Sequence, residues 1–219
     1  MIRFWDFKLP GAPPLLSLVV GQTEDDVAVK LARVVVVGTS CSGKTTFARR
    51  LASILGTCCF ELDALYWGSG WTRRPDFQQE VLAAAQQSRW VIDGNYSRVR
   101  DLIWRRCTAI VWLDYSFGRV FSRALRRTMR RVVIGERLYG GNRETIRNAL
   151  FDVEAPLWLV VRTHGKRRRE FPELFRRPEY RHATVIQLCA PAAAETFLAE
   201  TSVSAELESL AHPERGGAD

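Results

Sequence analysis

Short runs of β-branched and other apolar residues alternate along this chain with longer segments whose apolar residues recur every three or four positions. The first pattern is typical of buried strands, and the second is typical of helices that pack through one face. Strands are predicted over 33–37, 58–62, 90–93, 109–113 and 184–188. Helices are predicted over 44–55, 76–88, 97–106, 117–132, 143–151, 155–170 and 191–200. Such an alternation predicts an α/β domain with flanking helices on a five-stranded parallel sheet.

The periodic pattern covers residues 31–200, which we expect to form one domain. Residues 1–30 contain several prolines and no sustained periodicity, so they are predicted to be an N-terminal extension. Residues 201–219 are predicted to be a flexible tail. The segment from about 119 to 181 contains several helical patterns and no strand, and we expect an arginine-rich helical lid there, over the carboxyl edge of the sheet.

One motif carries most of the chemistry. Residues 38–45 read GTSCSGKT and satisfy the pattern G-x-x-x-x-G-K-[ST], directly after an all-valine strand and directly before a helical segment. In that setting the backbone N–H groups of the loop converge on phosphate oxygens, and the helix dipole favours the same anion. The phosphate-binding residues are therefore predicted to be Gly38, Thr39, Ser40, Cys41, Ser42, Gly43, Lys44, Thr45 and Thr46. Lys44 would bridge the β- and γ-phosphates of ATP, and the Thr45 hydroxyl would bind Mg²⁺.

Carboxylates follow two other predicted strands. Asp63 comes just after the second strand, and Asp93 ends the third. Because the carboxyl ends of the strands line the ligand crevice of an open α/β sheet, both side chains should reach the phosphate loop. Asp93 is predicted to hold the Mg²⁺ shell through water, and Asp63 to receive the proton of an acceptor hydroxyl. Each aspartate also fits a structural role as a turn or helix cap.

Two other classes of nucleotide-binding protein lack support. A GTPase would contain an Asn-Lys-x-Asp element, which this chain lacks. An AAA-type ATPase would end an apolar strand in Asp-Glu, but the strand over 109–113 is followed by Asp114-Tyr115. Both observations favour a kinase.

Charge is unevenly distributed over the 219 residues. The net charge is +8, but residues 119–181 contain 17 basic and 7 acidic side chains, a local charge of +10 that leaves −2 elsewhere. Such a segment is expected to bind an anion. We expect Arg123 and Arg127, on one face of the helix over 117–132, to face ATP and the transferred phosphoryl group. From the second lid helix, Arg162, Arg167 or Arg168 would close over the site; a solvated basic face is the alternative.

The five cysteines are odd in number and lie mostly in apolar runs, which predicts reduced packing residues of a cytoplasmic protein. The longest apolar runs, such as 34–37 and 109–113, are far shorter than the roughly 20 residues of a membrane-spanning helix. No secretory signal pattern opens the sequence. We therefore expect a soluble protein without a membrane partner.

Three stretches read GTSCSGKTTFARRLA, LDALYWGSGW and WVIDGNYSR, and an apolar strand ending in Leu-Asp and an arginine-rich helical region follow them. Together they resemble the adenylate-kinase-like P-loop proteins that are labelled DNA topology-modulation proteins, over roughly residues 33–200. The resemblance implies the nucleoside-monophosphate-kinase fold, with its parallel strands in the order 2-3-1-4-5 and a lid.

DGNYSR is also similar to the Asp-Gly-x-Pro-Arg segment of adenylate kinases. That likeness implies that Asp93 serves magnesium and that Gly94 and Arg98 contact the acceptor, Arg98 through its phosphate. Here the proline is absent and one residue is inserted before Arg98. The usual element for AMP after the second strand is also missing.

Aromatic residues stand in place of that AMP element. Tyr66, Trp67 and Trp71 closely follow Asp63, and an exposed aromatic cluster beside a phosphate site suits stacking on a planar base. We expect Trp67 and Trp71 to bind the acceptor, which favours a nucleoside or nucleotide. Ordinary core packing is the alternative for these residues.

The sequence thus predicts an ATP- and Mg²⁺-dependent kinase that acts on a small-molecule acceptor of unspecified identity. A second hypothesis is a P-loop ATPase that binds DNA through the basic segment 119–181, because neutralised phosphates drive non-specific DNA affinity. A third is a regulatory ATP-binding module without an acceptor.

Overall fold

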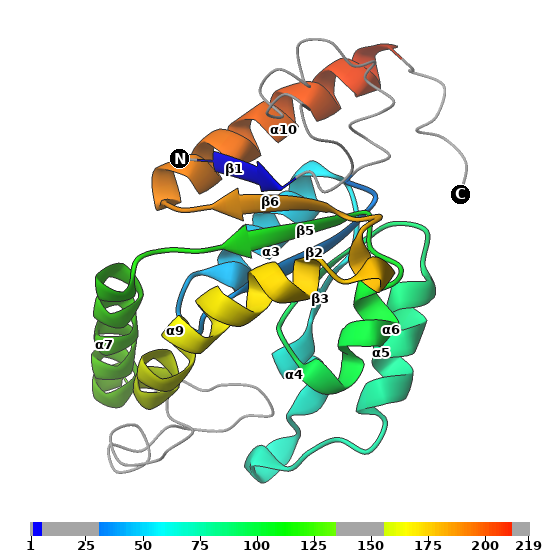
Figure 1. The fold of residues 1–219 in the computed structure, drawn as a ribbon. Helices are drawn as coiled ribbons and strands as arrows, with labels where there is room; N and C mark the ends of the chain where they lie inside the picture. Colours follow the sequence, from blue (N-terminus) through cyan, green and yellow to red (C-terminus); the bar gives the residue numbers. More distant parts are fainter. Residues whose placement is uncertain (1, 6–30, 135–155, 212–219) are drawn as a thin grey trace.

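The structure, a computed structural model, describes residues 2–5, 31–134 and 156–211 (Figure 1). In this part of the chain six strands form one sheet in the order β1-β6-β5-β2-β4-β3. Their bounds are Ile2–Trp5 (β1), Arg33–Gly38 (β2), Cys59–Glu61 (β3), Trp90–Asp93 (β4), Ala109–Leu113 (β5) and Thr184–Leu188 (β6). The five strands from β2 to β6 pair in parallel. Numbered among themselves, they lie in the order 2-3-1-4-5, which confirms the predicted P-loop kinase fold.

The sixth strand, β1, was not predicted. It pairs antiparallel with β6, with Ile2 opposite Leu188 and Trp5 opposite Val185. A strand of four residues in a stretch without periodicity gives almost no pattern, because only its pairing with β6 distinguishes it from a loop. β1 therefore extends the sheet beyond the parallel core at one edge (Figure 1).

Seven α-helices lie in the described residues. Their bounds are Lys44–Ile54 (α3), Leu62–Tyr66 (α4), Phe77–Gln86 (α5), Arg100–Trp104 (α6), Phe117–Ile134 (α7), Pro156–Phe175 (α9) and Pro191–Ala211 (α10). Short 3-10 turns cover Ser69–Trp71, Ser97–Val99 and Pro178–Tyr180. The helix predicted over 143–151 lies outside the described residues.

Several boundaries differ from the prediction. The strand predicted over 58–62 ends at Glu61, because Leu62 turns inward to begin α4. The helix predicted over 97–106 is a 3-10 turn followed by the five residues of α6. The helix predicted over 44–55 ends one residue earlier, at Ile54, and Gly56, with φ +58°, donates its N–H to the Ser53 carbonyl after the last turn.

The sheet is covered on both faces, as the alternation of side chains along β2 requires. Val34 and Val36 pack with Leu51 of α3 and Phe197 of α10. Val35 and Val37 pack in a second cluster with side chains from α5, α6 and the carboxyl-terminal half of α9. All four valines are fully buried, which explains why β2 is a continuous apolar run.

Helix α9 serves two parts of the molecule. Its carboxyl-terminal half belongs to the core, where Phe171 and Phe175 pack on the rings of Trp104 and Trp112. Its amino-terminal half lies beside α7 (Figure 1). The range 119–181 that was predicted as a lid thus includes a half-helix that packs against the sheet.

Two sequence expectations concern the whole chain. All five cysteines are free thiols, and they range from buried Cys107 to exposed Cys58. Among the described helices, none combines the length and the apolar composition needed to cross a bilayer.

Candidate functional site

The loop over residues 38–45 joins β2 to α3 at the carboxyl edge of the sheet. A side chain at Gly38 would place its Cβ 2.8 Å from the Leu113 carbonyl oxygen of the neighbouring strand, so the close approach requires glycine. Gly43, with φ +94°, is the residue before the first turn of α3. Because α3 begins at Lys44, its unpaired N–H groups and its positive dipole end face the loop. This geometry could hold an anion.

Lys44 bends back over this loop. Its Nζ donates a hydrogen bond to the Thr39 carbonyl oxygen at 3.1 Å. Burial lowers the pKa of the ammonium group, and the nearby carboxylates of Asp93 and Asp63 partly oppose that shift. Both aspartates therefore lie within electrostatic reach of Lys44, as the sequence predicted from the ends of the strands.

Asp93 ends β4, directly beside β2, and is buried. Thr45 Oγ1 donates a hydrogen bond to Asp93 Oδ2 at 2.5 Å. Asp93 Oδ1 is buried and has no hydrogen-bond partner among the described residues. Burial raises the pKa of this carboxyl group, although Lys44 and Thr45 favour the ionised form. A buried oxygen that lacks a partner is a ready ligand for a water molecule or a cation.

This oxygen set fits Mg²⁺. The ion prefers hydroxyl, carboxylate and phosphate oxygens, and it is usually held by one or two carboxylates together with substrate phosphates. In the described ranges, no group of three or more His, Cys, Asp or Glu side chains is placed to hold a metal by itself. Thr45 and Asp93 could thus hold the ion only in company with phosphate oxygens or water.

Asn95 is a site residue that the sequence analysis missed. Its amide nitrogen donates to the Gly38 carbonyl oxygen, and its Oδ1 accepts the Gly38 N–H at 3.2 Å. An amide side chain presents a donor and an acceptor side by side, which suits these two backbone contacts, and the asparagine was present in the DGNYSR motif. The preceding Gly94 has φ +146°, and a Cβ there would lie 2.8 Å from the Leu62 side chain.

Asp63 lies in the first turn of α4 and is exposed. The Tyr96 hydroxyl donates a hydrogen bond to Asp63 Oδ1 at 2.7 Å. Burial and the Asp63 charge raise the pKa of Tyr96, so the phenol remains a donor at neutral pH. Tyr96, also missed, thereby fixes one oxygen of Asp63 and leaves the other available.

Three arginines from α7 and α9 meet the loop. Arg123 Nη1 donates to the Ser42 carbonyl oxygen at 2.8 Å, and Arg127 Nη1 lies 4.0 Å from Cys41 Sγ. Arg167 Nη1 donates to the Gly38 carbonyl oxygen at 3.2 Å. Burial lowers the pKa of Arg167. These contacts bring three of the predicted arginines to the phosphate loop.

Other predicted arginines lie elsewhere. Arg168 forms an ion pair with Asp114, with Nε 2.9 Å from Oδ1. Arg98 and Arg162 are exposed, and neither forms a hydrogen bond or ion pair with another described residue. The structure therefore does not bring Arg98 or Arg162 into contact with the loop.

The aromatic residues after Asp63 pack on one another. The ring centroids of Trp67 and Trp71 are 5.6 Å apart in an edge-to-face arrangement, and Tyr66 contacts Trp67, Phe77 and Tyr96. Trp71 nevertheless remains 38% exposed. Mutual packing explains most of this cluster, and Trp71 retains surface for a ligand.

Among the 20 chains of solved structures that match this protein, two are described here, and both are kinases. A sugar kinase from Janibacter sp. HTCC2649 is 22% identical over 43% of this chain and 66% of its own, just under two thirds, with a TM-score of 0.32. Shikimate kinase from Acinetobacter baumannii, solved with shikimate, is 16% identical over 88% of this chain and 99% of its own, with a TM-score of 0.44. No family model and no curated protein matches the chain. These likenesses are too distant to support a function, and neither concerns DNA topology.

Proposed function

We propose that this protein is an ATP- and Mg²⁺-dependent kinase that transfers the γ-phosphoryl group to the hydroxyl of a small molecule, of the nucleoside or nucleotide kind. One observation carries the proposal: Lys44, the Thr45–Asp93 pair and Arg123 all converge on a single anion-binding loop. Phosphoryl transfer depends mainly on positioning and on cations that neutralise charge, and this arrangement supplies both.

The residues of the loop would hold the triphosphate. The backbone N–H groups of residues 38–45 and the Lys44 ammonium group would bind the β- and γ-phosphates, and Asn95 would keep Gly38 in place. Thr45 and Asp93 would hold Mg²⁺, which when bound neutralises the negative charge of the phosphates. Arg123, Arg127 and Arg167 would stabilise the charge that develops on the transferred group.

Asp63 would act on the acceptor. Its free carboxylate oxygen would accept the hydroxyl proton while the acceptor oxygen forms a bond to the γ-phosphorus and the bond from that phosphorus to the ADP oxygen breaks. Tyr96 would hold Asp63 in position for this step through the hydrogen bond at 2.7 Å. Trp71, which is 38% exposed in the segment that follows Asp63, would stack on a planar acceptor.

The proposal is tested by ADP release with Mg²⁺ against a panel of nucleosides, nucleoside monophosphates and small hydroxy acids. At least one compound should raise ADP release well above basal hydrolysis. With that compound, Asp63→Asn should lower turnover by about 10²- to 10⁴-fold, the usual contribution of a general base, and leave ATP binding intact. Unchanged turnover in Asp63→Asn would refute the role of this residue.

DNA binding remains the alternative function, motivated by the charge of residues 119–181. The contacts of Arg123 and Arg167 with the phosphate loop favour a kinase instead, because these side chains face the nucleotide site and not an outer surface. Exposed arginines such as Arg119 and Arg126 keep the alternative testable.

A further inference from the structure

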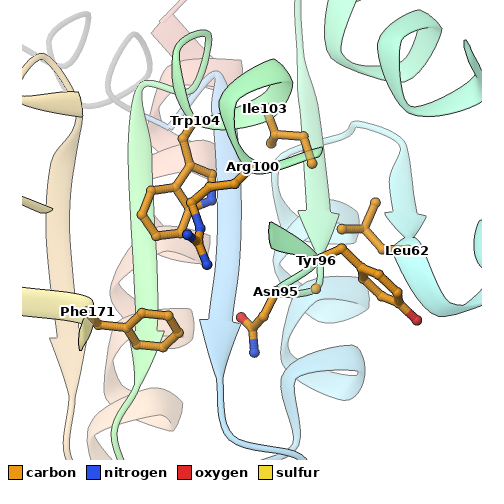
Figure 2. A pocket seen from close by; sticks show the side chains of 8 residues that line it. Leu62, Asn95, Tyr96, Arg100, Ile103, Trp104 and Phe171 are labelled. Atoms are coloured by element: carbon orange, nitrogen blue, oxygen red, sulfur yellow. The ribbon is translucent and has the colours of Figure 1, made fainter. Parts of the chain in front are cut away.

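A narrow pocket opens beside Asn95, between α4, α6 and the carboxyl-terminal half of α9 (Figure 2). Its apolar walls are Leu62, Ile103, Trp104 and Phe171, all of which are buried. Three polar side chains also line it: Asn95, Tyr96 and Arg100. Its walls are packed too closely to admit a water molecule, so a ligand can meet this region only at its rim, where Asn95 and Tyr96 also belong to the candidate site.

Two of the three polar side chains are already engaged. The Asn95 amide bonds both backbone groups of Gly38, and the Tyr96 hydroxyl bonds Asp63. Arg100 differs, because its guanidinium group lies over the Trp104 ring, 5.3 Å from the centroid, and has no hydrogen bond or ion pair within the described residues. Figure 2 shows this group reaching into the space between Trp104, Phe171 and Asn95. A half-buried guanidinium with unused N–H donors favours an anion.

A second cation lies within electrostatic reach. The positive charge of Arg100 adds to the effect of burial in lowering the pKa of Arg167, whereas Asp63 and Glu170 act in the opposite direction. Two guanidinium groups that repel each other in a partly apolar setting are stabilised when an oxyanion lies between them.

We propose that Arg100 binds an oxyanion group of the acceptor, a carboxylate or a phosphate, on the side of the candidate site where Asn95 and Tyr96 lie. This inference rests on the proposed kinase function and specifies its substrate class as small hydroxylated anions, in contrast to neutral nucleosides and sugars. It also moves the anion-binding role from Arg98, the position implied by the family resemblance, to Arg100. Arg98 is exposed, whereas Arg100 lines the pocket.

The test is calorimetric binding of two matched pairs of probes with the phosphate loop filled by a non-hydrolysable ATP analogue. The pairs are AMP with adenosine, and 3-(hydroxymethyl)benzoate with its methyl ester. Wild type should bind the charged member of one pair about tenfold or more tightly than its neutral counterpart, and the responding pair distinguishes phosphate from carboxylate. Arg100→Gln should weaken binding of that anion by about 10- to 100-fold, because hydrogen bonds to charged groups are involved, and leave the neutral probe unchanged.

Arg105→Gln removes the same charge from an exposed position in the same region and should change no affinity. Arg100→Lys should restore part of the affinity that Arg100→Gln loses. The inference is overturned if wild type shows no preference for either anion, if Arg100→Gln binds the anion as wild type does, or if Arg98→Gln alone causes the loss. ATP-analogue binding by the same variants keeps these outcomes separate from a failure of the kinase proposal, which would abolish analogue binding in wild type.

Discussion

At the scale of single residues, the burial of Asp93 lowers the stability of the folded protein and leaves a carboxylate oxygen available for a ligand. Its carboxyl group is 6% exposed, one oxygen accepts the Thr45 hydroxyl, and the other lacks a partner in the described chain. Burial disfavours the ionised form and raises the pKa of Asp93. A purely structural aspartate would have both oxygens bonded, so the unsatisfied oxygen points to a ligand-binding role.

This environment predicts that Asp93→Asn raises the free energy of unfolding of the ligand-free protein at neutral pH. The folded-state pKa lies above the ordinary value of 3.8, so wild type loses stability as the pH rises from 3.8 through the folded-state pKa. The advantage of the variant should therefore be absent below pH 3.8 and should grow above it. Urea unfolding across the pH range measures the difference.

Asp76→Asn provides a control of opposite sign. Hydrogen bonds from Arg74 lower the pKa of Asp76, so its carboxylate stabilises the fold above pH 3.8 and that contribution is lost as the pH falls through the lowered value. Asp76→Asn should lower stability at neutral pH. If Asp93→Asn also lowers the free energy of unfolding at neutral pH, the burial of Asp93 does not destabilise the folded protein and this interpretation is wrong.

The site residues that the sequence could predict are those in the loop motif and the carboxylates that follow predicted strands. The motif and the carboxyl edges of the strands predicted Lys44, Asp63 and Asp93 near one another, because strand order brings those ends together. Asn95 and Arg100 escaped prediction, since the role of each depends on which backbone or ring lies opposite. That information comes only from packing.

At the scale of elements, a buried polar group joins β5, β6 and α9. Asp114, which follows β5 and is 5% exposed, accepts hydrogen bonds from Arg168 of α9 and from Gln187 of β6, the latter at 2.7 Å. This junction fixes α9 against the sheet and so positions the neighbouring Arg167 on the Gly38 carbonyl oxygen.

Asp114→Ala should lower the free energy of unfolding by about 1–3 kcal/mol, because the Gln187 amide loses a buried acceptor and Arg168 loses its ion pair. Affinity for an ATP analogue should fall as well, since Arg167 loses its support. Lys166→Ala breaks an exposed ion pair with Glu170 on the same helix and should change stability by less than about 0.5 kcal/mol. Equal effects of the two substitutions, measured by urea unfolding, would contradict this role for the junction.

The helices and strands that could be predicted are those with a clear pattern of apolar residues. The buried strand β2 is a run of four valines and could not be mistaken, whereas β3 and α4 share a boundary at Leu62 where one apolar run changes its period. The short strand β1 contains residues that favour strands, but four residues are too few to establish a pattern, and its pairing with β6 makes it a strand.

At the scale of the whole molecule, several of the positively charged side chains in residues 119–181 form specific contacts within the protein. Arg123 and Arg167 bond to the phosphate loop and Arg168 to Asp114, so each of these three cations already has a partner within the protein. Exposed arginines on α7, such as Arg119 and Arg126, remain available to solvent. The kinase account therefore predicts little affinity for nucleic acid.

Duplex DNA should bind more weakly than about 10⁻⁴ M at about 0.15 M salt, the weak limit of non-specific binders. A salt titration by fluorescence anisotropy measures both the affinity and its salt dependence. Micromolar affinity, with a steep loss as salt rises, would instead support DNA binding through the basic segment. Arg119→Gln with Arg126→Gln should then weaken that affinity.

The proposed kinase function requires the loop between β2 and α3 to bind a triphosphate, with Lys44 as the main cation. Equilibrium binding of a non-hydrolysable ATP analogue with Mg²⁺, compared between wild type and Lys44→Ala, tests this requirement. The account predicts saturable binding by wild type and an affinity at least about tenfold lower in the variant, because a charge-assisted contact to phosphate is lost. Equal affinity in a folded Lys44→Ala protein, or no binding by wild type, would contradict it.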